Sequence, residues 1–317
     1  MSEVLTAREL GNLQLSSVVK PYLIDKGIMG QAEKRITYAL PKHLKTMEAF
    51  WEGFHIAGGI NYLNFKVMQG RVLYIGLEGT LSKLQPRIFK MRASFPDSSW
   101  DNFAFTVLKP LERNISEIGG LISKQQNLNL TIIDPLTSLL AREDKKEDVE
   151  GLLKELDRLI DTYHTAMHII HHARKGRGQA ETLENMRGST ALPGWADTIC
   201  RVSRVNSNKD KINLSFETRY GEDDLEDIVL NFDREHCSFS EDMSKVALIK
   251  LRIGALLCEA EAQGKRLYIS DIKSKLEDEA SDRTIDNAMI CMDEIEEKVD
   301  DIDRRKRYLA RKPLHNI

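Results

Sequence analysis

Apolar residues follow two alternating patterns along the first two thirds of the chain. From about residue 34 to residue 171, short β-branched runs alternate with longer segments that are apolar at helical spacing. The runs are KRITYA, RVLYIGL, FAFTVL, LTIID and AMHIIH, and the segments between them are 45–59, 80–92, 114–124 and 148–163. This alternation is typical of a parallel sheet flanked by helices, so we expect an α/β fold.

Glycines and charged residues interrupt the alternation between Ala173 and Thr190. A segment of this composition is expected to form an exposed loop. Three strand-like runs follow it, ADTICRVSR, KINLSFETR and EDIVLNFD, and polar turns join them. We expect these runs to add antiparallel strands to one edge of the sheet.

Helical spacing dominates beyond about residue 243. Residues 245–262, the run ISDIKSKL with Ser270 as its N-cap, and the segment that opens at Ser281 predict three helices. The basic segment DRRKRYLARK then predicts a charged hairpin, and three helices followed by a hairpin are the plan of a winged helix. The expected organisation is an N-terminal arm, a RecA-like core and a winged-helix-like domain, at 1–30, 31–240 and 241–317.

Composition and charge narrow the possible functions. With 317 residues, of which 41% are apolar and 30% charged, the chain is typical of a soluble cytoplasmic protein. The net charge of -3 shows no global preference for a polyanion, so any nucleic-acid contact should be local. No apolar run approaches the roughly 20 residues of a membrane span, and the acidic start does not resemble a signal peptide. We therefore expect no membrane contact.

The segment ALPKHLKT lies where a phosphate-binding loop would be, between a strand and a long helix. Lys45 would reach the β- and γ-phosphates, and Thr46 would bind Mg²⁺. The helix N-terminus would offer backbone N–H groups to the anion. The predicted nucleotide-binding residues are Pro41, Lys42, His43, Leu44, Lys45 and Thr46.

This loop departs from the motif GxxxxGK[ST], because Ala39 and Leu44 stand at the two glycine positions. A β-carbon at the second position hinders the close approach of the backbone to phosphates. Weakened or lost nucleotide binding therefore remains an alternative for this loop. Taken alone, the segment also fits an ordinary turn from a strand into a helix.

Carboxylates and histidines end three of the other predicted strands. RVLYIGLE ends at Glu78, LTIID ends at Asp134, and AMHIIHH ends at His171 and His172. Because ligands of parallel sheets bind outside the carboxyl ends of the strands, these side chains should meet the loop at one rim. From there Asp134 could complete a magnesium site. Each residue alone also fits a solvated strand end, or a buried histidine.

In their order along the chain, these motifs resemble the RecA-like ATPases of the RepA helicase type, which occur on plasmids, phages and related mobile elements. The resemblance covers about Pro21 to Phe239. It rests on PYLIDKGIM, ALPKHLKT, VLYIGLEG, LTIIDPLTSLL, HIIHHARKG, RGSTAL, ADTICRVSR, KINLSFETRYGE and IVLNFD.

The resemblance implies ATP and Mg²⁺ as cofactors and assigns roles to the strand ends. Glu78 would be the general base toward water, and Asp134 would support the metal. His172 or His171 would sense the γ-phosphate, and His172 is favoured. The family also implies a homo-oligomer, a hexameric ring, in which a neighbour donates an arginine across the interface; the candidates are Arg201, Arg204 and, more weakly, Arg187.

Basic residues in two segments are candidates for nucleic-acid contacts. In related proteins the loop at 173–190 contacts single-stranded DNA, and here it carries Arg174, Lys175, Arg177 and Arg187. The winged-helix domain could contact duplex DNA through Arg283, Asn287, Arg304, Arg305, Lys306 and Arg307. The acidic stretches EDEASDRTID and DEIEEKVDDID would repel phosphate, so a protein partner stays an alternative.

The leading hypothesis is an ATP-dependent DNA motor or helicase-type ATPase of a mobile element's replication or recombination machinery. A first rival is a degenerate P-loop protein that acts as a DNA-binding or regulatory scaffold, and Ala39 and Leu44 motivate it. A second rival is a strand-exchange recombinase, which the C-terminal winged helix fits less well.

Overall fold

The computed structural model describes residues 22–140, 145–173, 191–206, 208–219, 221, 225–242, 245–290, 292, 295–303 and 305–312. Contacts within the chain divide it into two compact units, and the division falls between Glu241 and Asp242. Each unit has its own apolar core. No helix among the described residues has the length and the apolar composition that a membrane crossing requires.

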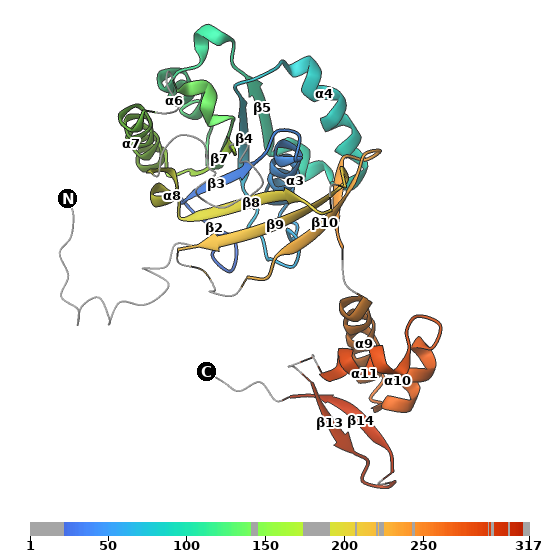
Figure 1. Ribbon diagram of the computed structural model, residues 1–317. Coiled ribbons are helices and arrows are strands. Elements are labelled where there is room, and N and C mark those ends of the chain that lie inside the picture. The colour runs from blue at the N-terminus through green and yellow to red at the C-terminus, as the bar shows by residue number, and fades with distance from the viewer. Residues whose placement is uncertain are drawn as a thin grey trace, which may run out of the picture. The chain divides into compact units, whose positions relative to one another are not determined.

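A nine-stranded mixed sheet forms the centre of the first unit (Figure 1). Its order is β11-β10-β9-β8-β3-β7-β6-β4-β5. The six strands from β8 to β5 run parallel to one another. From β8 outward, each of β9, β10 and β11 is antiparallel to the strand before it. The predicted parallel sheet with antiparallel edge strands is confirmed. The strands are β3 (Lys34–Ala39), β4 (Arg71–Gly76), β5 (Phe103–Val107), β6 (Leu128–Asp134), β7 (Ala166–His172), β8 (Thr198–Arg204), β9 (Lys211–Thr218), β10 (Ile228–Asp233) and β11 (Ser238–Glu241).

Helices cover both faces of this sheet, which explains why its parallel strands are apolar on both sides. One face packs against α3 (Lys45–Gly58), α4 (Leu81–Lys90) and α5 (Asp97–Asp101). The other packs against α6 (Ile115–Ile122), α7 (Lys146–Tyr163) and α8 (Ala191–Trp195) (Figure 1). Short 3₁₀ helices follow α4, β5 and β6; they are η1 (Met91–Ser94), η2 (Pro110–Glu112) and η3 (Leu136–Leu139).

Two short antiparallel strands, β1 (Tyr22–Ile24) and β2 (Met29–Gly30), precede the sheet in the sequence. Leu23, Ile24 and Ile28 are fully buried in the core on the α3 side. Residues 22–30, which the sequence places in an N-terminal arm, therefore pack into the first unit. The preceding arm residues lie outside the described part of the chain.

The described residues of the second unit form three helices and a three-stranded sheet. The helices are α9 (Lys245–Ala262), α10 (Ile269–Leu276) and α11 (Asp282–Ile290), and the sheet has the order β12-β14-β13. Its strands are β12 (Leu267–Tyr268), β13 (Ile295–Val299) and β14 (Arg307–Arg311). This order of elements is the one that a winged helix requires, and the winged-helix assignment itself stays a prediction.

The start of α10 differs from the sequence-based expectation. The helix begins at Ile269 with Tyr268 as its N-cap, so Ser270 lies inside it and does not cap it. The reason is that Tyr268 pairs with β14 and donates its hydroxyl to Asp300 at 2.7 Å. At α11 the contact agrees with the expected start at Ser281, since Oγ of Ser281 accepts the N–H of Thr284 at 3.4 Å.

Candidate functional site

The loop between β3 and α3 has an unusual backbone for its sequence. Lys42 and Leu44 adopt positive φ angles of 69° and 63°. This region costs a residue with a β-carbon roughly 1–2 kcal/mol. Leu44 is the N-cap residue of α3, and no side chain caps this end of the helix. The loop therefore has the backbone that glycine normally provides, and the positive end of α3 is open to an anion.

Lys45, the first residue of α3, contacts the end of a neighbouring strand. Its buried Nζ lies 3.0 Å from Nδ1 of His172. The register of β3 and β7 pairs Ala39 with His172, which places the histidine beside the loop. Since an ammonium group can only donate, Nδ1 of His172 is the acceptor. His171 points to the opposite face of the sheet and is fully buried.

Thr46 and Asp134 form the second contact at this rim. Thr46 donates its hydroxyl to Oδ2 of Asp134 at 2.6 Å, and Tyr74 donates to the same oxygen at 3.0 Å. Burial raises the pKa of Asp134, although the Thr46 hydrogen bond and the charge of Lys45 oppose the rise. Burial and the charge of Asp134 also raise the pKa of Tyr74, so its hydroxyl stays a donor.

The oxygens of Thr46 and Asp134 fit Mg²⁺. This ion takes one or two protein carboxylates and completes its shell with water and substrate phosphates. Among the described residues, no group of three His, Cys, Asp or Glu side chains could hold a metal ion. A magnesium ion at this rim would therefore depend on Thr46, Asp134 and the phosphates of a bound nucleotide.

Glu78 lies at the same rim, beyond the end of β4. The register pairs Gly76 of β4 with Asp134, and Glu78 is exposed directly after the buried Leu77. Its carboxylate accepts a hydrogen bond from Oγ of Ser138 at 3.3 Å. Its charge contributes to the raised pKa of Asp134, so the two carboxyl groups are close. An exposed carboxylate in this place can act on a water molecule.

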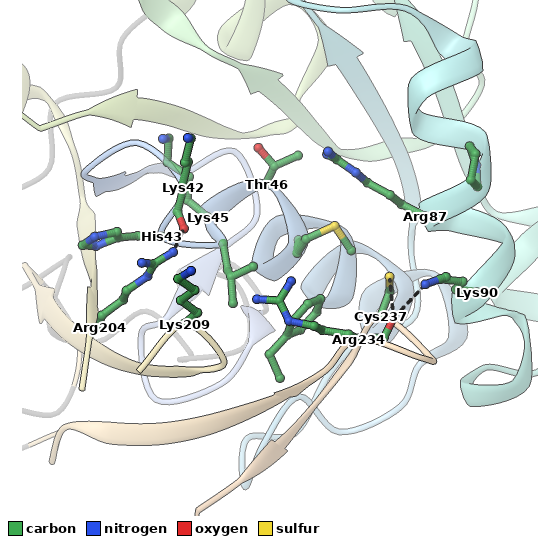
Figure 2. Close-up of a pocket in the computed structure, with 14 residues that line it drawn as sticks. Lys42, His43, Lys45, Thr46, Arg87, Lys90, Arg204, Lys209, Arg234 and Cys237 are labelled. Atoms are coloured by element: carbon green, nitrogen blue, oxygen red, sulfur yellow. Dashed lines mark hydrogen bonds between the residues drawn. The ribbon is translucent and has the colours of Figure 1, made fainter. Parts of the chain in front are cut away.

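A cavity of about 840 Å³ opens beside the loop (Figure 2). Leu44, Met47 and Phe232 give it an apolar surface. Seven of its lining side chains are cationic: Lys42, Lys45, Arg87, Lys90, Arg204, Lys209 and Arg234. None of the described lining residues is acidic. The cavity thus suits a polyanionic ligand that also has an apolar or aromatic part.

Arg87 and Phe232 are site residues that the sequence reasoning missed. Arg87 extends from α4 toward Thr46 in Figure 2, and its charge opposes the raised pKa of Tyr74, so it lies near Tyr74. Phe232 reaches the cavity because the antiparallel strand β10 ends there. Arg87 is one of several cations in an amphipathic segment, and nothing in the pattern distinguishes it from the others.

Arg204 fixes the loop of its own chain, since its Nη2 donates to the carbonyl oxygen of Lys42 at 2.6 Å. Burial and the charges of Arg204 and Lys45 lower the pKa of His43, which favours the neutral imidazole. Arg201, three residues earlier on β8, points to the opposite face of the sheet. Contact of either arginine with a neighbouring subunit stays a prediction. Pro41 is exposed and does not line the cavity.

The remaining predicted site residues lie elsewhere. Arg174, Lys175, Arg177 and Arg187 are outside the described residues. Arg283 and Arg305 belong to the second unit, where both are exposed.

A buried charged network lies between α3 and the sheet. Arg35 of β3 forms ion pairs with Glu52 and, at 3.3 Å, with Glu48. Nδ1 of His168 on β7 lies 2.9 Å from Oε1 of Glu52. Burial raises the pKa of Glu48; burial acts the same way on Glu52, but the charges of Arg35 and His168 outweigh it and lower that pKa. All four side chains are at most 1% exposed, so they cannot reach a ligand in the cavity.

Comparisons with known proteins agree with this arrangement. A family model described as an AAA domain matches residues 13–178. The curated proteins include none that matches the chain. Many solved structures are similar to it, and two of them are each 14% identical over 66% of the chain. One is the RadB recombinase, with a TM-score of 0.49 over 90% of that protein. The other is a DnaB-like replicative helicase, with a TM-score of 0.52 over 57% of that protein, and it shows a shared fold.

Proposed function

Because this chain belongs to the AAA domain family, we propose that it is an ATP-dependent DNA motor, a helicase-type ATPase in the replication or recombination machinery of a mobile element. One observation carries the proposal. At the start of α3, Lys45 lies 3.0 Å from His172 and Thr46 lies 2.6 Å from Asp134. The residues proposed as phosphate-binding lysine, sensor and magnesium ligands therefore have their side chains at one rim.

ATP would bind with its phosphates at the start of α3, where the backbone N–H groups and the ammonium of Lys45 favour an anion. Mg²⁺, held at Thr46 and Asp134, would supply positive charge to the β- and γ-phosphate oxygens. Glu78 would orient and deprotonate the attacking water. His172 contacts Lys45 and would therefore respond when the γ-phosphate leaves.

Two residues beyond the predicted set would complete the pocket. Phe232 would stack against the base, since aromatic side chains bind the flat faces of bases. Arg87 would bind the γ-phosphate, because it extends toward Thr46 from α4.

The assembled form would be a homo-oligomeric ring in which a neighbour completes each site. Arg201 or Arg204 would be the arginine donated across the interface, and Arg204 also donates to the loop of its own chain. Single-stranded DNA would bind the basic loop at 173–190. Neutralising Lys175 and Arg177 should weaken that binding and flatten its salt dependence, and an unchanged salt slope would contradict the assignment.

The second candidate is a scaffold that binds nucleotide weakly or not at all. It is favoured by Leu44, whose β-carbon stands where the motif has glycine and whose φ is 63°. The presence of Glu78, Asp134 and His172 at one rim supports the motor instead, because a scaffold has no chemical need for this set.

Magnesium-dependent ATP hydrolysis, measured with and without single-stranded DNA, separates the two candidates. The wild-type protein should hydrolyse ATP, Lys45→Ala should fall to background, and Lys124→Ala, a change of an exposed lysine after α6, should match the wild type. Equal background rates in all three proteins would reject the motor and favour the scaffold.

A further inference from the structure

The cavity beside α3 has two ends of different character. Figure 2 shows Lys45 and Thr46 at one end, where the phosphates of a nucleotide would bind. The side chains of Lys209 and Arg234 line the cavity away from this end. Phe232, the proposed platform for the base, precedes Arg234 by two residues at the end of β10. Arg234 is thus placed to contact the base of a nucleotide and not its phosphates.

Asp210 holds the side chain of Arg234 in one orientation. Nε of Arg234 lies 2.6 Å from Oδ1 of Asp210, in an ion pair. The carbonyl oxygen of Asp210 also accepts the backbone N–H of Phe232 at 2.7 Å, so Asp210 positions both residues. Nη1 and Nη2 of Arg234 have no hydrogen bond to the described residues, and the side chain is 59% exposed. The guanidinium therefore presents two parallel N–H donors to the cavity.

Hydrogen-bond donors dominate this end of the cavity. The side chains of Lys209 and Arg234 can donate but cannot accept. The carbonyl oxygen of Arg234 already accepts from Nζ of Lys90 at 2.9 Å. The carboxylate of Asp210 pairs with Nε of Arg234 and is not among the described groups that line the cavity. A ligand with two neighbouring acceptors is matched here, whereas a ligand with an N–H donor in this place is not.

The charge of Arg234 favours a neutral pair of acceptors over a further phosphate. Its guanidinium and the carboxylate of Asp210 together carry no net charge. The pair keeps the donors of Nη1 and Nη2, but its attraction for an anion is weakened. The start of α3 and the ammonium of Lys45 remain for the phosphates.

One edge of guanine has the matching pattern of acceptors. Its O6 and N7 accept two hydrogen bonds from one arginine, whereas adenine has the donor N6 in place of O6. We propose that Arg234 is a specificity-determining residue and that the cavity binds GTP more tightly than ATP. The base lies against Phe232, and its O6 and N7 accept from Nη1 and Nη2 of Arg234. Asp210 is a positioning residue, because it directs this edge of the guanidinium toward the base.

Because this preference rests on the proposed function, it concerns the same site and the same reaction. GTP and ATP make the same phosphate contacts, so ATP still binds, and the difference in affinity comes from the base alone. Loss of the preference and loss of nucleotide binding are therefore separate results.

Calorimetric titration of the full chain with Mg²⁺ and either GTP or ATP tests the preference. GTP should bind at least about tenfold more tightly, which is the discrimination expected of one bidentate pair. ITP, which keeps O6 and N7 but lacks the 2-amino group, should bind as GTP does. The 7-deaza analogue of GTP lacks N7 and should bind more weakly than GTP. Equal affinities for GTP and ATP would overturn the preference and leave the ATPase in place, whereas binding of neither would overturn both.

Three variants test the assignment to Arg234. Arg234→Ala should lower the affinity for GTP to that for ATP and leave the affinity for ATP within a few-fold. Asp210→Asn should reduce the preference in the same direction, whereas a merely structural loss would lower both affinities together. Arg92→Ala, which changes an exposed arginine of η1, should keep the preference of the wild type. A preference for GTP that survives in Arg234→Ala would mean that another group reads the base and would overturn the proposal.

Discussion

Helix α3 carries ionisable residues in two opposite settings. At its first turn, Lys45 joins the loop and the other cations that line an open cavity without any described carboxylate. Three and seven positions further along, Glu48 and Glu52 are sealed against the sheet, where Arg35 balances them within ion-pair distance. The first setting gathers positive charge beside an open cavity, and the second pairs its charges inside the core. Substitutions around the cavity should therefore alter ligand binding and turnover, and substitutions in the buried network should alter the free energy of unfolding.

Glu78→Gln should have the largest effect, and only on chemistry. Removing a general base lowers turnover by about 10²–10⁴-fold. Affinity for ATP and the thermal unfolding temperature should stay unchanged, because Glu78 is exposed and outside the buried network. Steady-state hydrolysis and equilibrium nucleotide binding check this, with Glu117→Gln, an exposed glutamate of α6, as the control. Loss of ATP binding in Glu78→Gln would mean that Glu78 holds the ligand.

Arg35→Ala should have the next largest effect, on stability. Removal of one partner from a buried ion pair costs about 3–5 kcal/mol of unfolding free energy, since Glu48 and Glu52 would be left without their cation. Urea unfolding followed by circular dichroism measures the change. Arg158→Ala breaks the exposed pair with Glu155 and should cost less than about 1 kcal/mol. A similar small cost for Arg35→Ala would contradict the structural role of the network.

His55, near the end of α3, should make stability depend on pH. Burial lowers its pKa to about 4, and its side chain is 8% exposed. In the unfolded chain a histidine titrates near roughly 6.5, so the unfolded state binds more protons between these values. His55 should leave the free energy of unfolding unchanged above that pH and should lower it by about 3 kcal/mol at pH 4. Unfolding free energies of wild type and His55→Phe across this range should show a shallower slope in the variant.

A matched change elsewhere controls for other titrating groups. His164→Asn replaces an exposed histidine after α7 with a residue that tolerates the same left-handed backbone. It should leave the pH slope unchanged. Equal slopes for wild type and His55→Phe would contradict the assignment.

The smallest effect should come from the loop, where strain and packing can be separated. Leu44→Ala and Leu44→Gly both remove the partly buried leucine side chain, but only glycine relieves the positive φ. The glycine variant should be more stable than the alanine variant by about 1 kcal/mol. The order should reverse at Gly151 in α7, where Gly151→Ala meets open space and should stabilise the helix. Calorimetric unfolding of the wild type and the three variants measures both differences in stability.

Much of the fold could be predicted because local patterns specify it. The run KRITYA corresponds to β3 residue for residue, and β6 ends at Asp134 as LTIID predicted. The rim residues Lys45, Thr46 and Glu78 also follow from position, since parallel strands end at one edge. The contacts between segments that are far apart in the sequence could not be predicted.

Arg204 and Arg35 illustrate this limit. Arg204 reaches Lys42 across 162 positions of sequence, and only the fold reveals that it serves its own loop. Arg35 looks like an ordinary charged residue on a strand, yet it is 1% exposed because Glu48 and Glu52 neutralise it from α3. Whether charged side chains pair inside a core depends on their neighbours in three dimensions, so the spacing of residues in the sequence does not predict the pairing.

The most direct measurement of the central claim is calorimetric titration of the full chain with magnesium and ATP. The cavity beside α3 should bind ATP in the wild type, and Lys45→Ala should weaken the affinity at least about tenfold, which is the loss of one charge-assisted contact. The nucleotide-free variant should stay folded, since Lys45 lines the cavity and the ion pairs of Arg35 with Glu48 and Glu52 remain. Equal affinities in the two proteins, or no binding by the wild type, would contradict the account.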